Sequence, residues 1–104
     1  MIIQSSNEPI VLTFSEDAAE IPAMRVSLWN GDRKVKEWTK ADVICEGTIV
    51  SCPLTQEETA RFPAGPLLLE VKWLDSDGIT EFAEAVQVMV APRKDKAVME
   101  WLSR

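Results

Sequence analysis

The sequence predicts an all-β protein, an antiparallel sandwich of about seven strands with one short helical turn near residues 55–61. Hydrophobic and polar residues alternate along most of the chain, which is the period of a strand with one buried face. Turn sequences interrupt this alternation roughly every eight to twelve residues, as in antiparallel sandwiches and barrels. A chain of 104 residues, 46% of them hydrophobic, can bury a core of its own. We therefore expect one domain over residues 1–92, followed by a C-terminal extension over 93–104.

The first predicted strand covers residues 9–14, and a hairpin follows over residues 24–38. Asn30-Gly31-Asp32 is a strong signal for the hairpin turn. If Gly31 and Asp32 form a two-residue loop, the register follows from the spacing. The pairs it predicts are Leu28 with Val35 on the core face, and Trp29 with Lys34 and Arg25 with Trp38 on the outer face.

A second hairpin is predicted over residues 42–54, with Glu46-Gly47 as its turn. This register places Cys45 opposite Thr48 and Cys52 opposite Ala41. Because the two cysteines do not face one another, we expect two free thiols, at least one of them buried.

A capping box begins the predicted helical turn, in which Thr55 caps a backbone N–H and the Glu58 side chain reaches back. The alternation from residue 67 to 74 marks the clearest strand, which we expect to be central. Asp75-Ser76-Asp77-Gly78 predicts another hairpin turn, with strands on either side. The predicted core comprises Leu28, Val50, Leu54, Leu69, Val71, Trp73, Val86 and Val88.

Residues 50–65, with the sequence VSCPLTQEETARFPAG, carry a resemblance to a known group of proteins. This run is similar to the strand, turn and corner of small immunoglobulin-like β-sandwich proteins from phage and prophage tail or baseplate gene clusters. The strand at 69–73, the Asp77-Gly78 turn, the closing valines and the Asn30-Gly31 hairpin extend the resemblance over about residues 9–92. It implies an immunoglobulin-like fold and a structural role in a virion or phage-like particle, with the host cytoplasm as the site of assembly. The implied partners are other tail or baseplate proteins, with a homo-oligomer as one form, and the resemblance implies no catalytic residues.

Charge and composition exclude several classes of function. The net charge is −6, and residues 1–92 alone carry −8, which would repel a nucleic-acid backbone. The chain has no histidine, so Ser-His-Asp and Cys-His catalysis and the commonest zinc ligand are excluded. No run approaches the roughly 20 apolar residues that span a bilayer, and the N-terminus lacks the features of a signal peptide. We expect a soluble protein that is not an enzyme, holds no cofactor or metal, and binds neither nucleic acid nor membranes.

One motif invites a metal-site interpretation. Asp75 and Asp77 resemble the opening of a calcium loop, but position 12 of such a loop would be Val86 in place of the usual glutamate. The sequence favours a plain hairpin turn.

The tryptophans are the most informative residues for function, since the chain has four and no tyrosine. Trp29 and Trp38 are predicted on the outer face of the first hairpin. A ladder of indoles and cations there could serve only to stabilise the hairpin, or it could form a contact patch for a partner. In the C-terminal extension, apolar residues spaced for one helix face would either fold back or dock on a partner. The predicted contact residues are Arg25, Trp29, Lys34, Lys36, Trp38, Val98, Trp101 and Leu102.

Two hypotheses follow from these observations. The first is a non-enzymatic structural module of a phage tail or baseplate that acts through protein–protein contacts. The alternative is a carbohydrate-binding sandwich, in which exposed Trp29 and Trp38 stack on sugar rings for adhesion. Because the neighbours of these indoles are mainly Lys and Arg, the sequence favours the first.

Overall fold

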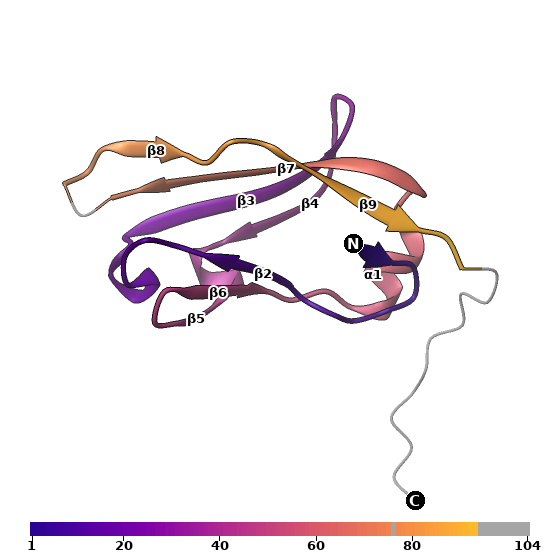
Figure 1. The fold of residues 1–104 in the computed structure, drawn as a ribbon, viewed down its shortest axis with the longest axis horizontal. Coiled ribbons are helices and arrows are strands. Elements are labelled where there is room, and N and C mark those ends of the chain that lie inside the picture. Colours follow the sequence, from indigo (N-terminus) through magenta and orange to yellow (C-terminus); the bar gives the residue numbers. More distant parts are fainter. Residues whose placement is uncertain (76, 94–104) are drawn as a thin grey trace, which may run out of the picture.

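A computed structural model describes residues 1–75 and 77–93 as a mainly β protein with one short helix. The strands in this part of the chain form two sheets that lie one above the other (Figure 1). The larger is a curled, six-stranded sheet with the order β1-β9-β7-β3-β4, in which β8 also pairs with β7. The smaller is a three-stranded antiparallel sheet with the order β2-β6-β5.

The larger sheet consists of β1 (Ile2–Ile3), β3 (Ala23–Asn30), β4 (Arg33–Thr39), β7 (Gly65–Leu74), β8 (Thr80–Phe82) and β9 (Val86–Ala91). The smaller consists of β2 (Ile10–Thr13), β5 (Ile44–Glu46) and β6 (Ile49–Cys52). Helix α1 (Gln56–Arg61) and the 3₁₀ turns η1 (Ala18–Glu20) and η2 (Lys40–Asp42) complete the described elements. None of the helices in this part of the chain has the length and apolar character to cross a membrane. The prediction that residues 67–74 form a central strand is confirmed, because β7 pairs with β3, β8 and β9.

The core lies between the two sheets and is built by alternate residues of their strands. The prediction of burial is confirmed for Leu28, Val50, Leu54, Leu69 and Val71. Trp73 and Val88 are only partly buried and pack against that core. Across the gap between the sheets, the Phe14 ring meets the Trp73 indole edge to face, with 5.1 Å between centroids.

Val86 contradicts the predicted core, since it is 54% exposed. It lies opposite Leu69 on the inner face of the larger sheet, as the alternation predicted. However, a three-stranded sheet cannot cover the whole inner face of a six-stranded one. The side chain therefore faces the core side of its own sheet but remains open to solvent.

The first hairpin has the predicted loop but not the predicted register. Asn30 pairs with Arg33 and Trp29 with Lys34, as expected for a loop of Gly31 and Asp32. Beyond that point a β-bulge leaves Val35 without an opposite residue, so that Leu28 pairs with Lys36 and Val26 with Trp38. The predicted pairs of Leu28 with Val35 and Arg25 with Trp38 are therefore wrong. Since one step of register turns a side chain to the other face, Trp38 lies in the core and is 1% exposed.

The N-terminal residues add a strand that the sequence did not indicate. β1 runs parallel to the end of β9, so the predicted purely antiparallel arrangement is wrong at this edge. The buried Gln4 side chain fixes the segment, donating through Nε2 to the Phe62 carbonyl (2.8 Å) and accepting at Oε1 from the Arg93 N–H (3.2 Å). One amide thus joins three segments that are distant in the sequence.

The second hairpin is shifted by one residue from its prediction. Glu46 pairs with Ile49, so the loop is Gly47-Thr48, and Gly47 adopts a φ of +59° that favours glycine. Cys45 consequently lies opposite Val50, and Cys52 lies opposite Ile10. The predicted partners of both cysteines are wrong, but both thiols are free and Cys52 is buried, as expected. Burial raises the pKa of the Cys52 thiol to about 12, and charge repulsion from Cys45 contributes a smaller part of the increase.

Helix α1 confirms the predicted capping box. Thr55 Oγ1 accepts from the Glu58 N–H at 3.1 Å, and Glu58 Oε1 accepts from the Thr55 N–H at 3.0 Å. The buried Thr59 donates through Oγ1 to the Ser6 carbonyl at 2.7 Å. The turn is therefore held both by its own cap and by the N-terminal segment.

Candidate interaction surface

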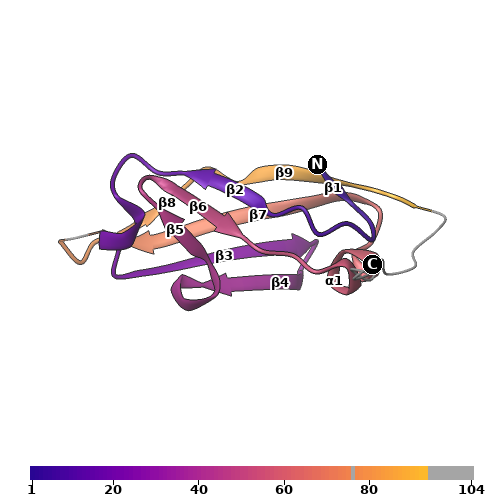
Figure 2. The same ribbon diagram turned by 90° about the horizontal axis from the view of Figure 1, so that it is seen from below.

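The outer face of the larger sheet carries most of the predicted contact residues that the structure describes. Arg25, Trp29 and Lys34 project from β3 and β4, on the face opposite the buried Met24, Val26 and Leu28. Strand β7 lies on the other side of β3 and brings Lys72 directly opposite Arg25. Seen from below, β4, β3 and β7 lie side by side (Figure 2).

A small ion-pair network crosses this face. Glu37 accepts both from Arg25, at 2.9 Å between Nε and Oε1, and from Lys34, at 3.2 Å. Lys34 also places its ammonium 5.2 Å from the centroid of the Trp29 ring. The predicted pairing of an indole with a cation is therefore confirmed at Trp29, whose Nε1 is buried without a hydrogen-bond partner in the described part of the chain.

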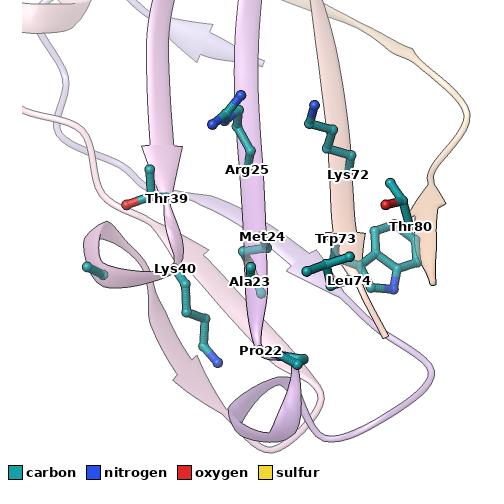
Figure 3. A pocket seen from close by; sticks show the side chains of 11 residues that line it. Pro22, Ala23, Met24, Arg25, Thr39, Lys40, Lys72, Trp73, Leu74 and Thr80 are labelled. Atoms are coloured by element: carbon teal, nitrogen blue, oxygen red, sulfur yellow. The ribbon is translucent and has the colours of Figure 1, made fainter. Parts of the chain in front are cut away.

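A cleft of about 500 Å³ lies where β3 begins and where β4 and β7 end (Figure 3). Figure 3 shows Arg25 and Lys72 extending in the same direction from neighbouring strands, with Lys40 at the far end. Apolar side chains complete part of its lining: Pro22 before β3, and Ala23 and Leu74 on the same face of the sheet as Arg25 and Lys72. The cleft therefore combines basic groups with an apolar wall.

Lys36 and Trp38 do not belong to this surface, which corrects their predicted placement. Trp38 Nε1 donates to the Pro53 carbonyl at 2.8 Å, inside the molecule. The Lys36 ammonium lies 5.4 Å from the Trp38 ring centroid and forms a partly buried ion pair with Glu58. These two residues stabilise the packing of β4 against α1.

The pair also affects the ionisation of Glu58. Burial by itself would raise the pKa of this carboxyl, but hydrogen bonds from Lys36 and Thr55, together with the charge of Lys36, lower it below its ordinary value of 4.5. The carboxylate is thus a structural group.

The remaining predicted contact residues, Val98, Trp101 and Leu102, lie outside the described residues. The sequence analysis also missed two residues of the cleft, Lys40 and Lys72. Alternation alone places Lys72 outward on its strand, since Val71 is buried beside it. Only the pairing of β3 with β7 reveals that it adjoins Arg25.

The smaller sheet has an exposed outer face of a different character. Val11, Ile44 and Ile49 are 57%, 62% and 45% exposed. Val11 and Ile44 flank Ser51, while Ile49 lies between Thr13 and Glu46. Three branched aliphatic side chains are therefore gathered on a sheet of only three strands.

The Asp75 motif forms the predicted hairpin turn. Asp75 Oδ1 accepts from the N–H groups of Asp77 and Ile79, both at 2.9 Å, and β7 and β8 pair on either side. Within residues 1–75 and 77–93, no three His, Cys, Asp or Glu side chains are grouped to hold a metal ion. The turn geometry itself accounts for the aspartate at position 75.

Comparison with known proteins gives no relative, because no protein-family model, no curated protein and no solved structure matches this chain. The surfaces described above are therefore the basis for the function proposed below.

Proposed function

We propose that this protein is a non-enzymatic structural module of a phage or prophage tail or baseplate, and that it acts through protein–protein contacts. We further infer that its two sheets are a divergent immunoglobulin-like sandwich. Such a module would reside in the virion or phage-like particle and would be assembled in the host cytoplasm.

The observation that supports this proposal is that two opposite faces of the sandwich carry exposed side chains of the kinds that form protein contacts. One is the outer face of the larger sheet, with Arg25, Trp29 and Lys72; the other is the aliphatic face with Val11, Ile44 and Ile49. Trp and Arg are enriched where interfaces concentrate binding energy, and gathered exposed apolar side chains mark interaction sites. A subunit with two opposite surfaces can bind a neighbour on each side, as a component of an extended assembly must.

The carbohydrate-binding alternative loses its main support. It required a platform of two exposed indoles, and Trp38 is buried with its Nε1 bonded to Pro53. Trp29 alone remains on the outer face, covered in part by Lys34. We therefore favour assembly over adhesion.

The proposal can be tested by producing a tagged copy of the chain in its host during particle production. We expect the tag to sediment with tail particles on a density gradient. Replacing both Ile44 and Ile49 by Glu, or Trp29 by Ala, should reduce its incorporation, because each change removes apolar contact area from an exposed face.

The matched control is Glu57→Gln, an exposed substitution on α1, and circular dichroism would establish that all variants fold. A tag found only among free proteins would contradict the proposal. Unchanged incorporation of every variant would contradict the assignment of these two surfaces.

A further inference from the structure

The cleft shown in Figure 3 concentrates positive charge in an acidic protein. Three cations, Arg25, Lys40 and Lys72, belong to its lining, and no carboxylate from residues 1–75 and 77–93 does. The whole chain has 17 acidic and 11 basic residues, so such a grouping is unlike the average surface. Local charge of one sign in a concave site favours a ligand of the opposite sign.

These cations are only partly compensated by the rest of the described chain. The Lys72 side chain makes neither an ion pair nor a hydrogen bond within residues 1–75 and 77–93. Arg25 pairs with Glu37 through Nε, which leaves its two terminal amino groups for another acceptor. Lys40 donates to the carbonyls of Ala19 (3.3 Å) and Ile21 (2.5 Å), which are uncharged.

The openness and the remaining lining of the cleft favour a polypeptide segment over a small molecule. The cleft is open rather than enclosed, whereas sites for small molecules usually enclose most of the ligand. Leu74 and Ala23 lie on the same face of the sheet as Arg25 and Lys72 and offer an apolar wall beside them. A ligand that matches both features has carboxylates next to apolar groups, as in an acidic polypeptide segment.

We propose that this cleft binds an extended, acidic segment of a partner protein, with its carboxylates paired to Arg25 and Lys72 and an apolar side chain against Leu74. This inference rests on the proposed function and specifies the chemistry of one partner. The guanidinium of Arg25 can form two hydrogen bonds to one carboxylate, which favours carboxylate over a neutral ligand. The net charge of −6 does not prevent binding, since at physiological salt charges more than about 8 Å away are largely screened.

The test measures fluorescence anisotropy of the full chain with a labelled peptide in which glutamate alternates with leucine and serine. A second peptide carries glutamine in place of each glutamate. We expect the glutamate peptide to bind and the glutamine peptide to bind at least about tenfold more weakly. Added salt should weaken the glutamate complex.

The decisive variant is Lys72→Glu, because Lys72 is exposed and its replacement should not disturb the fold. We expect it to weaken peptide binding at least about tenfold. The matched control is Arg33→Glu, which makes the same change of charge in the hairpin, outside the cleft. Lys72→Met removes the charge without reversing it and should give an intermediate loss.

The inference would be overturned by no binding of the glutamate peptide, by equal binding of the glutamine peptide, or by equal losses for Lys72→Glu and Arg33→Glu. Displacement of the peptide by an equal concentration of inorganic phosphate would also overturn it, since the site would then take small anions. The two proposals can fail separately. Normal incorporation of Lys72→Glu into particles would contradict only the role of the cleft. If the wild-type chain is absent from particles but still binds the peptide, only the tail function is contradicted.

Discussion

Trp29 and Trp38 show how far two similar residues of one hairpin can differ. A lysine ammonium lies within 5.2–5.4 Å of the centroid of each ring, and both tryptophans were predicted on the outer face. The bulge at Val35 leaves Trp29 on that face and turns Trp38 into the core. The first is therefore available for contact, while the second contributes to folding.

We predict that Trp38→Ala lowers the free energy of unfolding by about 3–5 kcal/mol, because it removes a fully buried ring and leaves a cavity. Trp38→Phe should cost less, since it keeps an aromatic ring and loses mainly the hydrogen bond to Pro53. Urea denaturation of both variants, with Trp29→Ala as the matched control, measures the difference. If Trp29→Ala proved as destabilising as Trp38→Ala, the assignment of the two faces would be wrong.

Among the elements, helix α1 shows how local and distant interactions meet in one short segment. Its capping box was readable from four consecutive residues, Thr55 to Glu58. Its contact with β4, through Lys36 and Glu58, joins residues 22 positions apart. Without such contacts, a helix of six residues would be only marginally stable.

We predict that Glu58 contributes to the pH dependence of stability. Because its pKa is lower in the folded chain than the ordinary value of 4.5, the ionised carboxylate stabilises the fold above that pH. This stabilisation is lost as the pH falls from there through the folded pKa. Glu58→Gln should be less stable than the wild type near pH 7, and the difference should shrink in acid.

The measurement is urea denaturation of the wild type and Glu58→Gln between about pH 7 and pH 3, which spans the ordinary pKa of the carboxyl. Glu57→Gln is the control, since Glu57 is an exposed residue of the same turn. A constant difference between wild type and Glu58→Gln at every pH would contradict the prediction.

At the scale of the whole molecule, two sheets enclose one core and leave two outer faces of unlike chemistry. The larger face is charged and carries a basic cleft, while the smaller one is aliphatic. The thiols of Cys45 and Cys52 are not joined, although both belong to the smaller sheet. The fold is thus held by packing and hydrogen bonding in the described part of the chain.

We predict that reductant and chelator leave the melting temperature unchanged. A shift of more than about 4 °C, which corresponds to roughly 1 kcal/mol in a domain of this size, would show that a disulfide or a metal ion contributes to stability. Differential scanning calorimetry with and without each reagent gives the comparison. Cys45→Ser serves as a control for any disulfide formed between molecules.

The sequence by itself determined the features that depend on neighbouring residues. These include the alternation of the strands, the loop at Gly31 and Asp32, the cap at Thr55 and the turn at Asp75. Each follows from backbone chemistry within a few positions. Arg25, Trp29 and Lys34 could be assigned to an outer face for the same reason.

Only the tertiary structure decided the bulge at Val35, the parallel pairing of β1 and the exposure of Val86. It also decided that Lys72 joins Arg25 in one cleft, because that requires β7 to lie beside β3. Each of these depends on which distant segments meet, and on how much of one sheet the other can cover. Such relations have no counterpart in the spacing of residues along the chain.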